Sequence, residues 1–295
     1  MTGIYKKYSV YIISLTVVIF WASAFPAVKF CLDYYSPESI MLFRFLTAST
    51  VVGIYYALRR AILPDRQDLP RLALAGVIGI FIYMWFFNTG TSYISAGLSS
   101  FIISACPLAT LLLSIVFLKE RAGWLCWAGM LISFLGLTLI ASTEADGFSL
   151  NIGVVLLLGA MVSTSIYNII LRGLLKKYSP MVTTSFSIFF ATALMLIFIP
   201  GLLRDFQSAP LIANVLCIYL GIFPAALAYF LWNYALSIAE KTIQVTSFLY
   251  LAPFISASMS YVWLGEVLKP EVVAGGVIII SGLVIANVKK QKRSQ

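Results

Sequence analysis

PLATLLLSIVFLKERAGWLCWAGMLISFLGLTLI, residues 107–140, is the stretch that decides the fold of this chain. One apolar run ends at the charged triplet KER at 119–121, and a second apolar run carrying Gly129 and Gly136 follows at once. Two apolar runs separated by a short charged turn predict a pair of helices joined by a tight loop.

The same plan recurs 146 residues later in the chain. A shift of that length superposes, without a gap, Pro107 on Pro253, Ser114 on Ser260, Glu120 on Glu266, Gly129 on Gly275 and Gly136 on Gly282. Leucine and isoleucine would match by composition alone, but proline, glutamate and glycine are not the common residues of these segments. The match therefore indicates an internal repeat, which determines the architecture.

The amino-acid composition indicates whether water or lipid surrounds the protein. Of 295 residues, 61% are hydrophobic and only 11% are charged, whereas ordinary globular chains carry roughly 25% charged residues. A soluble chain of this length needs Lys, Glu, Arg and Asp to cover its surface. The surface of this protein is therefore expected to face lipid.

The sequence offers little for metal or cofactor chemistry. The chain has no histidine, which removes the commonest zinc ligand and the commonest general base near neutral pH. No nucleotide-binding sequence G-x-x-x-x-G-K-[ST] occurs. The cysteines are scattered and are interpreted as small apolar residues: Cys31, Cys106, Cys126 and Cys217. We expect no metal and no cofactor.

Apolar stretches of spanning length occur ten times. A helix needs about 20 residues to cross the hydrocarbon core. The stretches are 9–30, 37–58, 69–88, 94–118, 122–141, 151–171, 181–200, 211–236, 242–264 and 271–288. The sequence predicts an all-α integral membrane protein with ten transmembrane helices.

The net charge of +9 is distributed unevenly between the loops. When the amino terminus is placed in the cytoplasm, sixteen Lys and Arg residues fall in inner loops, and only Lys29, Arg204 and Lys269 fall in outer ones. This bias is the positive-inside signature and predicts that both termini are cytoplasmic. The basic residues are then topology signals and contacts for anionic lipid, not a surface for nucleic acid.

The first span has an alternative interpretation as a secretory signal. Lys6 and Lys7, an apolar run and the A-S-A at 22–24 resemble a cleavable leader. Against cleavage, a shift of 143 places the Y-S-P at 35–37 on that at 178–180, and Lys29 on Arg172. The first span therefore has a partner later in the chain, and we keep it as a membrane helix.

The repeat divides the chain into two halves of five spans, 1–145 and 146–295. Because five is odd, the second half enters the membrane from the opposite side, which places Glu120 inside and Glu266 outside. An inverted repeat lets a membrane protein exchange two mirror-related states around a site near its midplane. The architecture therefore predicts transport.

Several motifs in order carry a resemblance to a known family. They are W-A-S-A-F at 21–25, Pro37 followed by R-F-L-T-A at 44–48, and the repeated pattern of proline, glutamate and paired glycines. With these motifs the whole chain resembles the ten-helix EamA branch of the drug/metabolite transporter superfamily. The resemblance implies a bacterial inner-membrane carrier, usually an exporter of amino acids or related small metabolites. Cys126 and Val272 depart from the family, which often has Gln near these positions.

Arg44 is the one ionisable residue well within a predicted span, and its counterpart in the repeat is Ser187. An ionisable residue inside the membrane is costly and is a functional candidate by default. Two roles are open: Arg44 binds a substrate carboxylate or latches an outer gate, or it only reaches to the interface and holds free carbonyls.

The repeated residues of the hairpins favour structural roles. Glu120 and Glu266 stand at helix ends, where they cap the next helix or pair with a neighbouring cation. The repeated glycines predict close helix packing. Pro107 and Pro253 interrupt the fourth and ninth spans, because proline removes a hydrogen bond and kinks a helix. We predict a hinge or cavity-lining role for them, although ordinary membrane helices also tolerate proline.

The predicted substrate site joins Arg44 to aromatic and neutral polar residues on helix faces: Trp21, Trp85, Asn88, Ser104, Tyr167, Asn168, Tyr229, Asn233 and Tyr250. Trp85 and Asn88 are included because they follow Phe81 at i+4 and i+7. Interhelical hydrogen bonding explains any single asparagine or serine equally well. As a set, the residues fit an uncharged pocket with aromatic walls.

The sequence thus favours a secondary or facilitative carrier for small neutral or zwitterionic metabolites, most of all an amino-acid exporter. A nucleotide-sugar or sugar-phosphate carrier is the nearest alternative, but it should need more than one buried cation to hold phosphates. An intramembrane lipid-modifying enzyme is a distant one, since it needs a nucleophile–base pair or a metal cluster. The substrate itself, the direction and the oligomeric state are not specified by the sequence.

Overall fold

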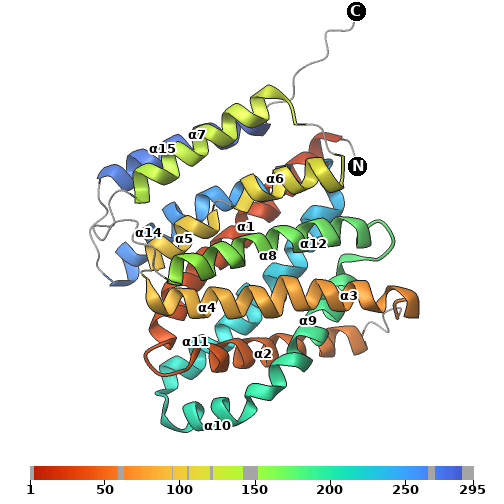
Figure 1. Ribbon diagram of the computed structural model, residues 1–295, viewed down its shortest axis with the longest axis vertical. Helices are drawn as coiled ribbons and strands as arrows, with labels where there is room; N and C mark the ends of the chain where they lie inside the picture. Colours follow the sequence, from red (N-terminus) through yellow and green to blue (C-terminus); the bar gives the residue numbers. More distant parts are fainter. Residues whose placement is uncertain are drawn as a thin grey trace, which may run out of the picture.

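The computed structural model describes residues 3–58, 63–94, 96–104, 106–119, 122–141, 152–264 and 270–287, and every regular element among them is helical (Figure 1). Each of the ten predicted spans is present as one helix or as consecutive helices. Six are long and apolar enough to cross a membrane, and the other four contain shorter apolar helices. The prediction of an all-α membrane protein is confirmed, while Glu120 and Glu266 lie outside the described residues.

The first half builds its spans from these elements: α1 (Gly3–Cys31), α2 (Pro37–Leu58), η1 (Arg66–Asp68), α3 (Leu69–Gly76), η2 (Val77–Ile82), α4 (Tyr83–Tyr93), α5 (Ala96–Ser104), α6 (Cys106–Phe117) and α7 (Trp124–Ala141). The second half uses α8 (Ile152–Leu174), α9 (Pro180–Met195), η3 (Leu196–Phe198), α10 (Ile199–Ser208), α11 (Leu211–Leu220), η4 (Gly221–Leu227), α12 (Ala228–Ile238), α13 (Ile243–Thr246), η5 (Ser247–Leu251), α14 (Ala252–Leu264) and α15 (Pro270–Asn287).

The Y-S-P sequences start the second helix of each half in the same way. Pro180 is the first residue of α9, and the hydroxyl oxygen of Ser179 accepts a hydrogen bond from the backbone N–H of Val182. Pro37 likewise begins α2, and the hydroxyl of Ser36 accepts from a backbone N–H three residues on. Serine as N-cap followed by proline at the first helical position is a favoured helix start.

Irregular helix geometry occurs at equivalent places in the two halves. The third and eighth spans each contain a π-helical segment, η2 and η4. The ninth span passes through the 3-10 segment η5 before α14 begins at Ala252, beside Pro253. An interruption beside Pro253 is therefore present, as expected. The one expected at Pro107 remains a prediction, because residue 105 lies outside the described residues.

The last helices of the two halves, α7 and α15, pack against each other along their length (Figure 1). Gly129 lies against the backbone of Gly282 and Ala286, and Gly136 lies against the backbone of Gly275. Because the contacts pair an early residue of one helix with a late residue of the other, the helices run antiparallel. Equivalent glycines meet crosswise, as an inverted repeat requires.

A second contact occurs once within each half, where it joins the first span of that half to the third. The ammonium of Lys29 donates to the carbonyls of Thr91 and Ile94 at the end of α4, both at 3.2 Å. Arg172, the repeat counterpart of Lys29, donates to the carbonyls of Leu236 and, at 2.7 Å, Ala239 at the end of α12. The last carbonyls of a helix lack intrahelical donors and attract cations.

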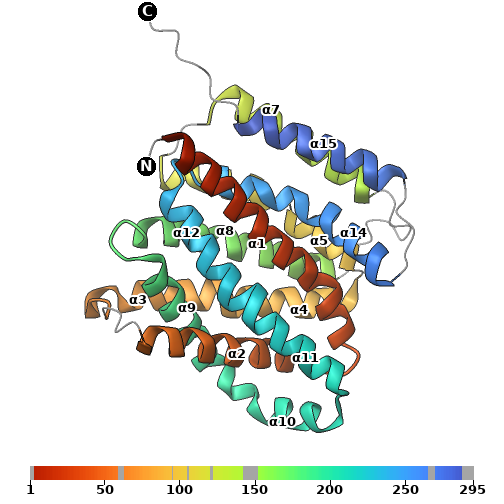
Figure 2. The ribbon, with the colours of Figure 1, turned by 180° about the vertical axis from the view of Figure 1, so that it is seen from behind.

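The halves also interlock around the second span of each. The Cα of Gly76 faces the backbone of Ser187, and the Cα of Gly221 faces the backbone of Arg44; a Cβ would lie 2.4 and 2.7 Å from the respective carbonyl oxygens. Since Ser187 is the counterpart of Arg44, these are two copies of one contact. The first helix, α1, also runs beside α11 and α12, which belong to the other half (Figure 2).

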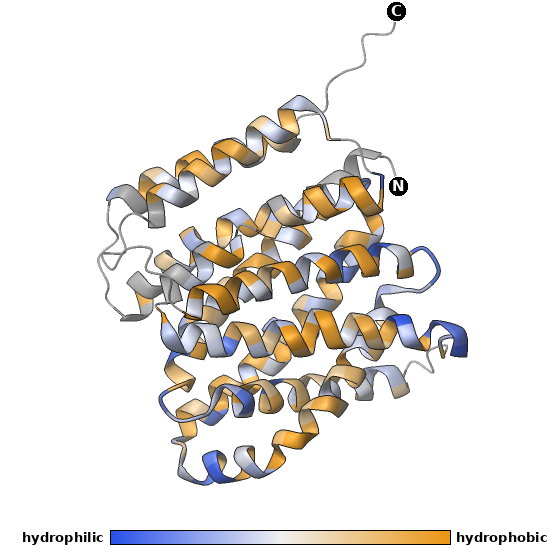
Figure 3. Ribbon diagram, in the orientation of Figure 1, coloured by the Kyte–Doolittle hydropathy of each residue, from blue (hydrophilic) through white to orange (hydrophobic). Residues whose placement is uncertain are grey.

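Hydrophobic residues run along the helices of the bundle, and hydrophilic ones gather toward the helix ends (Figure 3). Large apolar side chains such as Ile12 and Leu112 are exposed on the outer surface. In lipid such exposure has no cost, because the solvent is as apolar as the side chains. The surface therefore agrees with the composition.

The glycine packing predicts a measurable stability difference. In a Gly129→Ala variant the added Cβ would lie 2.3 Å from the backbone nitrogen of Ala286, so α7 and α15 must separate. We expect a loss of about 1–3 kcal/mol, typical of overpacking, seen as a lower apparent Tm in detergent. Gly173→Ala is the control, since nothing lies within 4 Å of its added Cβ. Equal melting of both variants would contradict close packing.

Candidate functional site

A buried cavity of about 40 Å³ lies between helices of both halves. It has room for only a few water molecules. The residues lining it come from α1, α2, α4, α5, α8, α12, η5 and α14: Trp21, Ala24, Phe25, Arg44, Tyr83, Met84, Phe87, Ile103, Ser104, Thr164, Tyr167, Tyr229, Trp232, Leu249 and Ala252. A space enclosed by both repeats is where an inverted-repeat carrier places its substrate.

Among the described lining residues Arg44 is the single charged one, and it is 2% exposed. One terminal nitrogen donates to the sulfur of Met84 at 3.6 Å, while Nε has no hydrogen-bond partner. Within the described residues Arg44 makes no salt bridge. A buried cation without a paired anion is costly. The site therefore has an unmet capacity to bind an anion.

Aromatic rings that contact one another form a wall of the cavity. The ring of Tyr229 is the hub of this wall, with centroids 5.8 Å from Trp21, 6.1 Å from Phe45 and 6.0 Å from Tyr167. The rings of Trp21 and Trp232 are 4.8 Å apart. These separations lie within the favourable range for aromatic pairs.

Hydrogen bonds fix the two indole rings of the wall. Trp21 donates from Nε1 to the carbonyl of Pro224 at 2.9 Å, within the π-helical segment η4. Trp232 donates from Nε1 to Oδ1 of Asn168 at 2.8 Å. Buried indoles normally have such a partner. Asn168 therefore lies behind the wall and orients Trp232.

The cavity also offers polar groups that are not used by the protein. The hydroxyl groups of Ser104 and Tyr167 make no hydrogen bond, and both residues are fully buried. The Tyr167 hydroxyl faces Asn233, without hydrogen-bond geometry. Buried polar groups are rarely left unpaired. With Arg44, these hydroxyls supply donors for a bound molecule.

Five of the predicted site residues are brought together at the cavity: Trp21, Arg44, Ser104, Tyr167 and Tyr229. The other five are not in its lining. Asn88 donates to the carbonyl of Pro37 at 3.0 Å, and Asn233 donates to Thr184 at 2.7 Å, so both connect helices. Asn168 supports Trp232, and Tyr250 is buried in η5.

Trp85 lies away from the cavity, on the outer face of α4, with 38% of its side chain exposed. The expected face followed Phe81 at α-helical spacing, and Phe81 itself is not in the lining. Tyr83, Met84 and Phe87 line the cavity instead, and no sequence signal pointed to them.

Pro107 and Pro253 are buried close to the lining residues Ser104 and Ala252. Their predicted action as hinges remains a prediction. Among the described residues, no group of three or more His, Cys, Asp or Glu could hold a metal ion.

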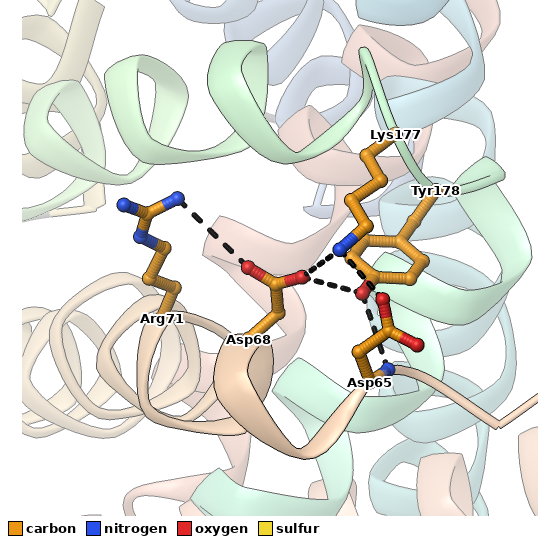
Figure 4. A network of polar contacts seen from close by, with 5 residues as sticks. All are labelled: Asp65, Asp68, Arg71, Lys177 and Tyr178. Atoms are coloured by element: carbon orange, nitrogen blue, oxygen red, sulfur yellow. Dashed lines mark hydrogen bonds and ion pairs between the residues drawn. The ribbon is translucent and has the colours of Figure 1, made fainter.

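A polar network outside the cavity joins the α8–α9 loop to the start of the third span (Figure 4). Lys177 contacts Asp65 at 2.7 Å and also pairs with Asp68, which accepts from the Tyr178 hydroxyl at 2.6 Å. Hydrogen bonds from Lys177 to Asp65 and Asp68 raise the pKa of its ammonium. The bonded charge is therefore present at neutral pH and is lost only at strongly alkaline pH.

A family model for the EamA-like transporter family matches residues 8–142 and 151–288. The chain belongs to this family. Its members are membrane transporters, and the EamA-like chain described here is one. The two matched stretches are compatible with a division near residue 145, although the position of that boundary remains a prediction.

Relatives of this EamA-like chain are similar over nearly their full length. It is 33% identical to the uncharacterized transporter YdfC of Bacillus subtilis, covering 93% of this chain and 90% of that one. It is also 33% identical to a probable terminal-alkyne amino-acid exporter of Streptantibioticus cattleyicolor, covering 95% and 93%. A protein of known crystal structure has the same fold, with a TM-score of 0.76 at 19% identity over 95% of this chain and 96% of its own.

The support of the aromatic wall can be tested by stability. Trp232→Phe keeps a ring but leaves the side chain of Asn168 without its donor, so we expect a loss of about 1–3 kcal/mol, as for a buried unsatisfied polar group. The apparent Tm in detergent should fall accordingly. Tyr234→Phe on the exposed face of the same helix is the control, and its Tm should match that of the wild type.

Proposed function

We propose that this chain exports amino acids or related small metabolites that carry a carboxylate, by alternating access through the central cavity. The observation that carries the proposal is Arg44, a buried cation without an ion pair in the described structure, set in an aromatic cavity between the two repeats. A bidentate pair of guanidinium and carboxylate is among the strongest polar contacts available to it.

The relative from Streptantibioticus cattleyicolor supports the substrate class. That protein is named as a probable exporter of terminal-alkyne amino acids, which combine a carboxylate with an apolar chain. The cavity of this chain offers the same combination, because Arg44 adjoins apolar residues such as Phe87 and Ile103.

The size of the cavity supports a moving carrier. Its volume of about 40 Å³ holds only a few water molecules, so we expect the helices around it to separate when the substrate enters. An inverted repeat provides two such openings, one on each side of the membrane. The irregular segments η2, η4 and η5 adjoin or contribute to this space, and backbone of this kind occurs at membrane depth only where protein or a cavity surrounds it.

Two alternatives have less support at the site. A sugar-phosphate carrier should surround its phosphates with several cations, and the lining contains one. An enzyme needs an activated nucleophile, and the lining contains neither a carboxylate nor a cysteine to act with its hydroxyls. A proton relay within the cavity also lacks support, because the described lining contains no carboxylate to carry the proton.

The orientation follows from the charges of the loops. We place the protein in the bacterial inner membrane with both termini in the cytoplasm, because the Lys and Arg residues accumulate in the loops assigned to that side. Anionic lipid is then a partner of the basic loops, and nucleic acid is not.

Transport by purified protein tests the proposal. In proteoliposomes loaded with an amino-acid panel that includes propargylglycine, we expect saturable counterflow of at least one member. Arg44→Gln should lower that rate by about ten- to a hundredfold, the range expected for a lost hydrogen bond to a charged group. Arg204→Gln removes an exposed cation that is not in the cavity lining and should leave the rate unchanged. Folded protein that moves no member would refute the amino-acid class.

A further inference from the structure

The charges around the cavity are one-sided. Of the fifteen lining residues that the structure describes, Arg44 is a cation and none is an aspartate or glutamate. An α-amino acid brings both a carboxylate and an ammonium, and a site that recognises both normally supplies an anion or several acceptors for the second. Here the carboxylate has a dedicated partner and the ammonium does not.

From this imbalance we infer that the carboxylate alone anchors the substrate, and that compact monocarboxylates lacking an amino group are bound as well as the corresponding amino acids. The inference rests on the proposed function, because it concerns the same cavity. It extends the substrate class from zwitterions to simple organic acid anions with an apolar body.

Proximity strengthens the inference. In an α-amino acid the ammonium is attached to the carbon beside the carboxylate, so pairing with Arg44 places the ammonium near the guanidinium. Like charges repel more strongly in a buried site than in water. Binding must also remove the ammonium from water, at a cost that a cation normally recovers only with a paired anion.

The remaining lining offers the ammonium weak compensation. The hydroxyl oxygens of Ser104 and Tyr167 can accept a hydrogen bond, and both are without one in this structure. The faces of Trp21, Tyr229 and Trp232 attract cations through cation–π contacts. These groups permit an ammonium in the cavity, but the same ring faces accommodate an apolar group without any desolvation of charge.

The apolar part of the lining sets the second requirement. Several of the lining residues have hydrocarbon side chains: Ala24, Phe25, Phe87, Ile103, Leu249 and Ala252. A substrate body with a further charged or strongly polar group would lose its hydration against these side chains. Straight-chain and phenyl-bearing monocarboxylates therefore fit the site better than dicarboxylates do.

Matched compounds test the inference on the unaltered protein. One set is L-phenylalanine, 3-phenylpropionate, L-phenylalaninamide and phenethylamine; the other is L-norvaline, pentanoate, L-norvalinamide and butylamine. Each set holds the apolar body constant and removes the ammonium, the carboxylate charge or the carboxylate. Binding is measured by quenching of intrinsic fluorescence, because Trp21 and Trp232 line the cavity, and by inhibition of amino-acid counterflow.

We expect the carboxylate and the amino acid of at least one set to bind within about threefold of each other. The amide and the amine of that set should bind at least tenfold more weakly. Binding of the amino acid at least tenfold tighter than of its carboxylate overturns the inference and leaves the proposed function intact. Binding of no member of either set overturns both, and preference for the amines assigns Arg44 a structural role and also overturns the inference.

Variants provide a second measurement that does not depend on overall affinity. Arg44→Lys retains the cation and should keep the preference for carboxylate over amide, whereas Arg44→Gln should reduce that preference to less than threefold. Arg204→Gln is the matched control, since it removes an exposed arginine and should leave the preference unchanged. Equal preference in Arg44→Gln and in the wild type would show that another group recognises the carboxylate.

Discussion

The structure depends on one constraint: within hydrocarbon, no solvent is available to hydrogen-bond the backbone. The chain meets this constraint with helices in every described span. Where the helix geometry changes at η2, η4 and η5, the segments pack against several other helices, whereas η3 has no buried residue. A carrier needs side chains and carbonyls to be accessible at membrane depth, and the enclosed irregular segments are where the fold allows this. The carbonyl of Pro224, which holds Trp21 in place, lies in such a segment.

The overall architecture was predictable from the sequence because it follows from repetition and apolar length. The crosswise packing of Gly129 on Gly282 is a direct consequence of a repeat that is visible in the amino-acid sequence. The site was predictable in part. Arg44 stood out because a charge in an apolar span is conspicuous, and Trp21 because its motif resembles that of a family.

The remaining site residues could not be predicted because the third span is apolar or aromatic on every side around Phe81, so the sequence does not specify which face points inward. The prediction followed Phe81 to Trp85, whereas Tyr83 and Met84 line the cavity. The π-helical segment η2 was not predictable either, because nothing in the run V-I-G-I-F-I distinguishes a π-helix from an α-helix by composition. Asparagines posed a different difficulty, since Asn88 serves the packing of helices and a substrate amide contact would have the same sequence signature.

The proposed site lies where the two halves differ. Their shared contacts include the helix-end bonds of Lys29 and Arg172, but the positions of Arg44 and Ser187 share only a backbone contact. A symmetric scaffold gives two openings of similar shape, and a single cation breaks the equivalence between them.

The bond of Lys29 to the end of α4 has a consequence for how topology is encoded. Lys29 is one of the few cations assigned to the outer side, where it opposes the insertion signal carried by the other loops. Its counterpart Arg172 makes the equivalent bonds on the inner side, where a cation agrees with the positive-inside signal. A cation required by the backbone at both faces cannot also report orientation, so in duplicated membrane proteins such positions should be left out of the charge count.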